Sequence, residues 1–256
     1  MQRLTALFAP IAAAMLAVAI LLPEPAMADV YELRTYTTNE GKLDNLNARF
    51  RDHTVRLFKK HGMESVGYWV PADEPNSKNT LIYVIKHKSR DAAKESWKAF
   101  LADPDWQKVA KESQVDGRIL AKAPESVYMD ETDYTPKFTS GKAGSNAAFE
   151  LRIYRCHPGK LANLDARFRD HTIRIFKRHG MESVAYWHPA DKPGSEDTLI
   201  YILRHESREA AKQSWDAFRQ DPEWQKVAKE SQRDGQFLRE RPESVYMTAT
   251  DYSAIQ

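Results

Sequence analysis

Three polar side chains share one face of the first predicted strand. Residues 30–38 alternate in polarity, which predicts a β-strand with Glu32, Arg34 and Tyr36 on the same side. An arginine presents five N–H donors in a planar fork that fits a carboxylate, and a neighbouring glutamate could pair with it or act as a base. The set therefore indicates either an anion-binding or catalytic site, or a buried ion pair that satisfies interior polar groups.

A histidine stands where the next segment calls for an apolar residue. Leu43, Leu46, Phe50, His53 and Leu57 recur at spacings of three and four, which predicts a helix with these residues on one side. A half-buried imidazole there could act as a general base or a haem ligand in a pocket between helix and sheet. The alternative is a structural histidine bonded to a buried oxygen. The sequence predicts no cofactor and leaves haem open.

The segment that carries these residues occurs twice. Residues 32–134 match residues 150–252 without a gap, and 69 of the 103 aligned positions are identical. This indicates a duplicated folding unit, with domains at 29–134 and 148–256 and a linker at 135–147. The second copy repeats the candidate catalytic residues as Glu150, Arg152 and His171. In copies this similar, the recurrence is expected and adds no independent evidence of function.

Aromatic residues form the third group with chemical potential. All six tryptophans fall into three duplicated pairs. Most are expected to pack in the core, and the rest could form a wall for a small apolar or aromatic ligand. The candidate ligand-binding residues are Tyr36, Trp69 and Tyr83 in the first copy and Tyr154, Trp187 and Tyr201 in the second.

Several other classes of function lack their sequence signals. The net charge is +2, with both signs interleaved along the predicted helices, so we expect no nucleic-acid partner. The chain has no glycine-rich phosphate loop, no His-x-x-x-His or paired cysteines for a metal, and no G-x-S-x-G nucleophile motif. With Cys156 as its single cysteine, it cannot form an internal disulfide.

The first 28 residues differ in composition from the rest. Arg3 precedes a long apolar run, and Ala26-Met27-Ala28 resembles a cleavage site, which together predict a signal peptide over residues 1–28. We therefore expect an exported protein, periplasmic or secreted, with no membrane segment after cleavage. A retained membrane anchor is the alternative.

Periodicity within each repeat predicts the order β-α-β-β-α-α-β. This is an α+β, ferredoxin-like arrangement in which helices cover one face of an antiparallel sheet. The bare face needs a partner, and stacking on a second copy would give a dimeric α/β-barrel type of packing. The partner sheet could come from the same chain, as an intramolecular pseudo-dimer, or from a homodimer. The strand face that carries Glu32, Arg34 and Tyr36 would form a site if it lined the barrel interior.

The motifs of both repeats resemble the NIPSNAP domain. In the first repeat they are Tyr31-Glu32-Leu33-Arg34-x-Tyr36, His61-Gly62, Tyr68-Trp69, Asp103-Pro104-x-Trp106-Gln107 and Glu125-Ser126-x-Tyr128-Met129, and the second repeat carries them 118 positions later. The resemblance implies the dimeric α/β-barrel superfamily, which also contains cofactor-free monooxygenases, haem-degrading enzymes and lactone isomerases. It implies no particular reaction. The better-known members resemble mitochondrial interaction and trafficking proteins, whereas the leader of this chain resembles a bacterial one.

Two functional hypotheses follow. The first is a binding or assembly module for a small ligand. The second is a cofactor-independent or haem-linked enzyme of monooxygenase or isomerase type, acting on an aromatic or carbonyl compound. In the enzyme, His53 and Arg34, or His171 and Arg152, would serve as base and anion clamp. A cavity that touches both His53 and Arg34 would favour the enzyme, and a barrel filled by Tyr and Trp would exclude an interior site.

Overall fold

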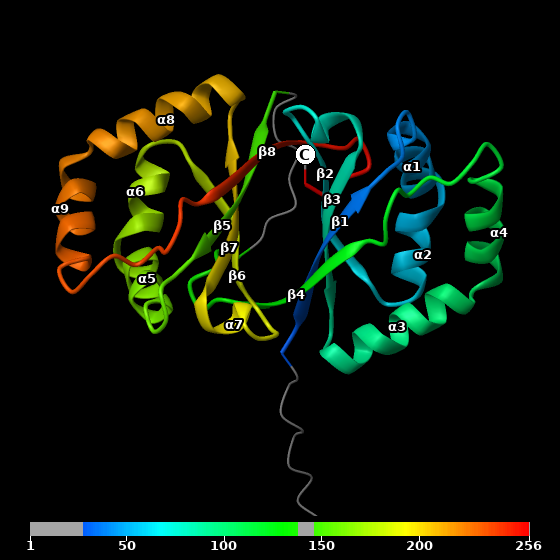
Figure 1. Ribbon diagram of the computed structural model, residues 1–256, viewed down its shortest axis with the longest axis horizontal. Coiled ribbons are helices and arrows are strands. Elements are labelled where there is room, and N and C mark those ends of the chain that lie inside the picture. The colour runs from blue at the N-terminus through cyan, green and yellow to red at the C-terminus, as the bar shows by residue number, and fades with distance from the viewer. Residues whose placement is uncertain (1–27, 138–145, 256) are drawn as a thin grey trace, which may run out of the picture.

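The computed structural model describes residues 28–137 and 146–255 (Figure 1). Nearly all of the predicted signal peptide and most of the predicted linker lie outside these residues. Within the described residues, no helix combines the length and apolar character needed to cross a bilayer.

Each repeat folds in the predicted order of strands and main helices. The first repeat contains β1 (Val30–Thr37), α1 (Leu43–Arg49), a π-helical turn η1 (Phe50–Thr54), α2 (Val55–Lys60), β2 (Glu64–Pro71), η2 (Asn76–Lys78), β3 (Thr80–His87), α3 (Arg90–Ala102), α4 (Pro104–Glu112) and β4 (Glu125–Glu131). The second contains β5 (Ala148–Arg155), α5 (Leu161–Arg167), η3 (Phe168–Thr172), α6 (Ile173–Arg178), β6 (Glu182–Pro189), α7 (Gly194–Asp197), β7 (Thr198–His205), α8 (Arg208–Gln220), α9 (Pro222–Ser231) and β8 (Glu243–Ala249).

The eight strands close into one barrel in the order β1-β3-β2-β8-β5-β7-β6-β4. The repeats join at two antiparallel seams, where β2 pairs with β8 and β4 pairs with β6. Figure 1 shows the strands in the middle and the long helices on the two outer flanks. One chain therefore supplies both halves of the barrel.

The segments that follow β4 and β8 each complete the core of the other repeat. Tyr134 packs with the aromatic core of the second repeat and donates a hydrogen bond to Asp165 at 2.6 Å. Tyr252 packs with the core of the first repeat and donates to Asn47 at 2.8 Å. Each repeat is a continuous segment of the chain, but part of its packing comes from the other repeat.

The barrel interior is a packed apolar core. Side chains from all eight strands meet there, including Leu33, Trp69, Phe149 and Trp187. The ring centroid of Trp69 lies 5.7 Å from that of Phe149, and the ring of Trp187 lies 5.6 Å from that of Tyr31. Both tryptophans are fully buried, so their expected place in a ligand-binding wall is wrong.

The polar face of β1 points away from this interior and lies under the helices. The interior receives Leu33 instead, because an apolar side chain gains free energy there whereas an ion pair would lose its hydration. The condition for an interior site, that Glu32 and Arg34 line the barrel, is therefore not met.

We expect Gly67→Ala to destabilise the protein by about 1–3 kcal/mol, because a Cβ at this position would lie 2.3 Å from Cη2 of the buried Trp69 ring. Urea denaturation measures the loss, and near-UV circular dichroism reports the displaced indole. Unchanged stability together with an unchanged near-UV spectrum would contradict the close packing of Trp69 on Gly67.

Candidate functional site

Glu32 is the centre of a buried hydrogen-bond cluster between the sheet and helix α3. One carboxylate oxygen accepts from Nη1 of Arg34 at 2.5 Å and from Oγ of Ser126 at 2.6 Å. The other accepts from Nε1 of Trp97 at 2.7 Å and lies 3.1 Å from Nε2 of His87. Both oxygens are thus engaged, so Glu32 positions Arg34 and Trp97 and is not a free base.

The pKa of Glu32 reflects this cluster. Burial by itself raises the pKa, but the hydrogen bonds from His87, Ser126 and Trp97 and the charge of Arg34 outweigh burial and lower the pKa to about 2. Glu150 has the same arrangement with the matching residues of the second repeat, and its pKa is also lowered to about 2.

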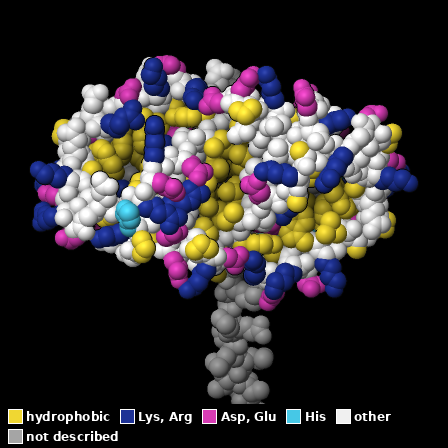
Figure 2. Space-filling view, in the orientation of Figure 1, with side chains coloured by type: hydrophobic (Ala, Val, Ile, Leu, Met, Phe, Trp, Pro, Cys, Tyr) yellow, Lys and Arg dark blue, Asp and Glu magenta, His cyan; other side chains and the backbone are white. Residues whose placement is uncertain are grey.

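Arg34 lines a cavity of about 520 Å³ on the outer side of the sheet. Its guanidinium Cζ lies 4.4 Å from the ring centroid of Trp97, and its Nε has no hydrogen-bond partner in the part of the chain that the structure describes. Figure 2 shows apolar side chains at the surface between α2, α3 and α4, with charged side chains around them. The cavity walls are formed by Tyr36, Arg49, Phe50, Thr54, Phe58, Trp97, Phe100, Leu101, Trp106, Ala110, Gln114, Arg118, Leu120 and Pro124.

Arg49 is the second cation of this cavity, and the sequence analysis did not identify it. The residue is 7% exposed, and none of the described residues forms a hydrogen bond with its Nε. Its Nη1 lies 3.5 Å from Oγ of Ser113, which is too long for a strong hydrogen bond. Its Cζ lies 5.4 Å from the ring centroid of Trp106. Among the described residues, no ion pair joins Arg49 to a carboxylate, and burial lowers the pKa of Arg49.

The π-helical turn η1 explains why His53 does not face the core. An extra residue in this turn shifts the apolar side of the helix, so Phe50 and Thr54 face the core. Oγ1 of Thr54 donates to the carbonyl of Arg49 at 3.1 Å, across the widened turn. His53 is exposed, which corrects the expectation of a half-buried imidazole based on regular helical spacing.

His53 and Arg34 do not share any of the described cavities. His53 lines a separate cavity of about 290 Å³ with Asp52 and Arg49, on the outer side of the helix. In the second repeat His171 is half-buried and lines the corresponding cavity beside Arg167. The geometry that would have favoured a His53-based enzyme is therefore not formed.

The two candidate tyrosines of the first repeat have different positions. Tyr36 lines the cavity, as expected for a ligand-binding residue. Tyr83 is fully buried behind it and donates a hydrogen bond to Oη of Tyr36 at 3.1 Å, so it supports the wall without forming it. Burial raises the pKa of Tyr83 well above its ordinary value. Tyr201 and Tyr154 repeat this bond at 3.0 Å.

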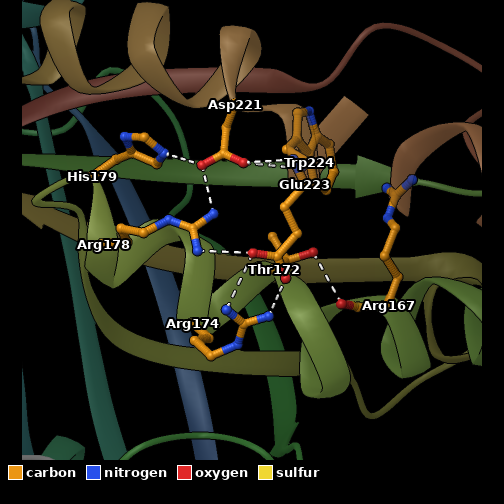
Figure 3. A network of polar contacts seen from close by, with 8 residues as sticks. All are labelled: Arg167, Thr172, Arg174, Arg178, His179, Asp221, Glu223 and Trp224. Atoms are coloured by element: carbon orange, nitrogen blue, oxygen red, sulfur yellow. Dashed lines mark hydrogen bonds and ion pairs between the residues drawn. The ribbon is translucent and has the colours of Figure 1, made fainter. Parts of the chain in front are cut away.

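The helix α9, which carries Trp224, begins at an aspartate N-cap, Asp221. In the second repeat, Oδ1 of Asp221 accepts from the backbone N–H of Trp224 at 3.2 Å, while Oδ2 contacts His179 at 2.7 Å and Arg178 at 2.6 Å (Figure 3). The ring of Trp224 then lies 5.1 Å from Cζ of Arg167. The N-cap and the proline after it can be recognised from the sequence. The contact between His179 and Asp221 cannot, because these residues lie 42 positions apart.

The residues present do not fit a haem or metal site. The described part of the chain contains no group of three or more His, Cys, Asp or Glu residues arranged to hold a metal ion. His53, the candidate haem ligand, is exposed, and the aromatic cavity presents arginines. The site is therefore suited to an anion with an apolar body.

Comparison with known proteins agrees with the fold. A "Protein NipSnap homolog" from Dictyostelium discoideum is 29% identical over 134 residues, which are 52% of this chain and 51% of the relative, so the match spans about half the length of each. A candidate monooxygenase structure from Fusobacterium nucleatum subsp. nucleatum has 10% identity and a TM-score of 0.53, covering 87% of this chain and 93% of that chain.

A NIPSNAP family protein of unknown function from Agrobacterium tumefaciens is 24% identical, with a TM-score of 0.36, over 43% of this chain and 93% of its own. The sequence profile of the NIPSNAP family matches residues 31–129 and 149–254, which are nearly the whole of both repeats. The chain thus belongs to the NIPSNAP family, with two tandem NIPSNAP domains in one barrel.

Proposed function

We propose that this protein binds a small aromatic carboxylate in the cavity lined by Arg34 and Arg49. The observation that carries the proposal is the charge balance. Three arginines line the cavity, Arg34, Arg49 and Arg118, and among the described residues only Arg34 is paired with a carboxylate, that of Glu32. A buried cation without a counter-ion is unfavourable, so its retention indicates that an anion completes the site.

The hydrogen-bonding groups match a carboxylate. Nε of Arg34 and Nε of Arg49 have no hydrogen-bond partner in residues 28–137 and 146–255. Glu32 holds Arg34 by one terminal nitrogen, which fixes the guanidinium before any ligand arrives. A pre-positioned arginine fork is a common way to bind a planar anion with directional hydrogen bonds.

The walls match an aromatic body. Trp97, Phe100, Trp106 and Tyr36 present ring surfaces around the arginines, and the volume of about 520 Å³ lies in the usual range for small-molecule sites. Aromatic ligands can stack on such rings and on the guanidinium planes. A binding role is favoured over the enzyme hypothesis, because Glu32 is fully bonded and His53 faces another cavity.

The proposal places the protein outside the cytoplasm, in the periplasm or secreted. The leader over residues 1–28 supports this placement, and an anion-binding protein there would act on compounds that enter from outside the cell. Size measurement of the mature chain from its own host would test cleavage after Ala28.

Isothermal titration with 2-naphthoate and the neutral 2-naphthamide tests the proposed function. We expect the carboxylate to bind at least about tenfold more tightly, because a hydrogen bond to a charged group contributes about 1.5–3 kcal/mol. Decanoate tests whether the walls prefer an aromatic body. Equal affinity for acid and amide, or no binding of any compound, would overturn the proposal. Native mass spectrometry of protein from its own host would identify a retained ligand.

A further inference from the structure

We infer that the two copies of the site are not equivalent: the first domain binds the aromatic carboxylate, and Phe237 blocks the matching site in the second. The inference rests on the proposed function and adds which domain binds and how many ligands each chain takes up.

The cations themselves are held alike in both domains. Arg152 bonds Glu150 at 2.6 Å, as Arg34 bonds Glu32 at 2.5 Å. Arg167 and Arg49 are each 7% exposed. A difference in binding must therefore come from the residues around the arginines.

Phe237 is the largest such difference. It stands where the first domain has Ile119, and its ring centroid lies 4.8 Å from Cζ of Arg167. The guanidinium of Arg167 thus has two aromatic neighbours, Phe237 and Trp224, whereas Arg49 has Trp106. Phe237 also lines the cavity of about 520 Å³ beside Arg167 and His171, so a protein ring already packs against the guanidinium where an aromatic ligand could stack.

The tryptophan that packs on Arg34 or Arg152 also differs in exposure between the two domains. Trp215 is 9% exposed, whereas its counterpart Trp97 is half-buried and lines the open cavity. Nη2 of Arg152 makes a long contact of 3.4 Å to Oη of Tyr154. This contact is too long for a strong hydrogen bond, and Nε of Arg152, like Nε of Arg34, has no hydrogen-bond partner among the described residues.

The residues at the rim of the cavity also differ between the two domains. In the first domain Arg118 and the exposed Leu101 line the cavity. Their counterparts are Gln236 and Arg219, and Arg219 is paired with Asp216. The first domain therefore has at the entrance an arginine that forms no ion pair with the described residues and an exposed apolar side chain, which suits an anion with an apolar body.

Reciprocal exchange of the blocking residue tests the inference by isothermal titration with 2-naphthoate. We expect one site per wild-type chain, two sites in Phe237→Ile, and an affinity at least tenfold weaker in Ile119→Phe. Each exchange introduces the residue that the other domain already accommodates, and thermal unfolding checks that both variants are folded.

The outcomes separate this inference from the proposed function. Two equal sites in the wild-type protein would overturn the inference and retain the proposed function. One site that neither exchange alters would also overturn the role of Phe237. If the wild-type protein binds no 2-naphthoate and Phe237→Ile binds none either, both the proposed function and the inference fail.

Discussion

Replacing Arg49 with methionine is expected to weaken binding of 2-naphthoate strongly and, at the same time, to stabilise the empty protein. Arg49 is buried, lacks a carboxylate partner among the described residues, and keeps an unbonded Nε. Methionine retains the apolar stem and removes the charge. A buried cation without a partner costs folding free energy, so we expect a gain of about 1–2 kcal/mol.

The expected loss of affinity is larger than this gain. Removing one partner of a buried charge pair commonly costs 2–5 kcal/mol, which corresponds to a weakening of about 30-fold or more. Isothermal titration measures the affinity, and urea denaturation without ligand measures the stability. Weaker binding together with a higher unfolding free energy would identify Arg49 as a functional residue retained at the expense of stability.

Two matched variants control the Arg49→Met experiment. Arg56→Met removes an exposed positive charge from α2, and we expect it to change stability by less than about 0.5 kcal/mol and to leave binding intact. Arg167→Met removes the counterpart in the second domain and is expected to leave the first site unchanged. A loss of stability above 1 kcal/mol in Arg49→Met would show instead that Arg49 is a structural residue.

Glu32→Gln is expected to destabilise the protein by about 3–5 kcal/mol at pH 7. The carboxylate accepts from Arg34, Ser126 and Trp97, and it lies against His87. An amide of the same shape carries no charge and turns an N–H group toward these donors. Removing one side of a buried ion pair leaves the other charge uncompensated, which is the reason for the large effect.

The same carboxylate makes the protein sensitive to acid. Its pKa is about 2 in the folded chain and 4.5 in the reference state, so its contribution is complete above pH 4.5. As the pH falls from about 4.5 toward 2, the unfolded chain takes up the proton first and the contribution is lost. The shift corresponds to about 3 kcal/mol for Glu32, and Glu150 adds a similar loss over the same interval.

Urea denaturation at pH 7, 4 and 3 measures both effects. We expect Glu32→Gln to have a flatter dependence of unfolding free energy on pH below 4.5 than the wild-type protein. Glu95→Gln removes an exposed carboxyl from α3 and should leave the profile nearly unchanged. A Glu32→Gln variant within 1 kcal/mol of wild type, with an unaltered acid profile, would refute the central role of Glu32.

Much of the fold was predictable because local patterns and the duplication agree. Alternation in β1, the N-cap at Asp103 and the proline after it each indicate the element that forms there. The ungapped repeat indicated two like units, and the apolar face of each sheet required a partner. The seams between β2 and β8 and between β4 and β6 needed the structure, since periodicity does not specify which strands meet.

The candidate site was predicted in part. Alternation placed Glu32, Arg34 and Tyr36 together, and these residues do share the outer face of the sheet. The error at His53 arose because regular spacing assumes an α-helix of 3.6 residues per turn, and the π-helical turn adds a residue. Arg49, the last residue of α1, was not predicted, because arginines are mostly solvent-exposed in proteins.

By itself, therefore, the sequence determined the family, the order of the elements and the grouping of Glu32 with Arg34, because these depend on residues close along the chain. The tertiary structure decided which face of the sheet is enclosed by the barrel, and that Arg49 joins Arg34 in one cavity. The reason is physical: burial and charge balance depend on side chains brought together from distant segments, and alternation or helical spacing carries no record of those contacts.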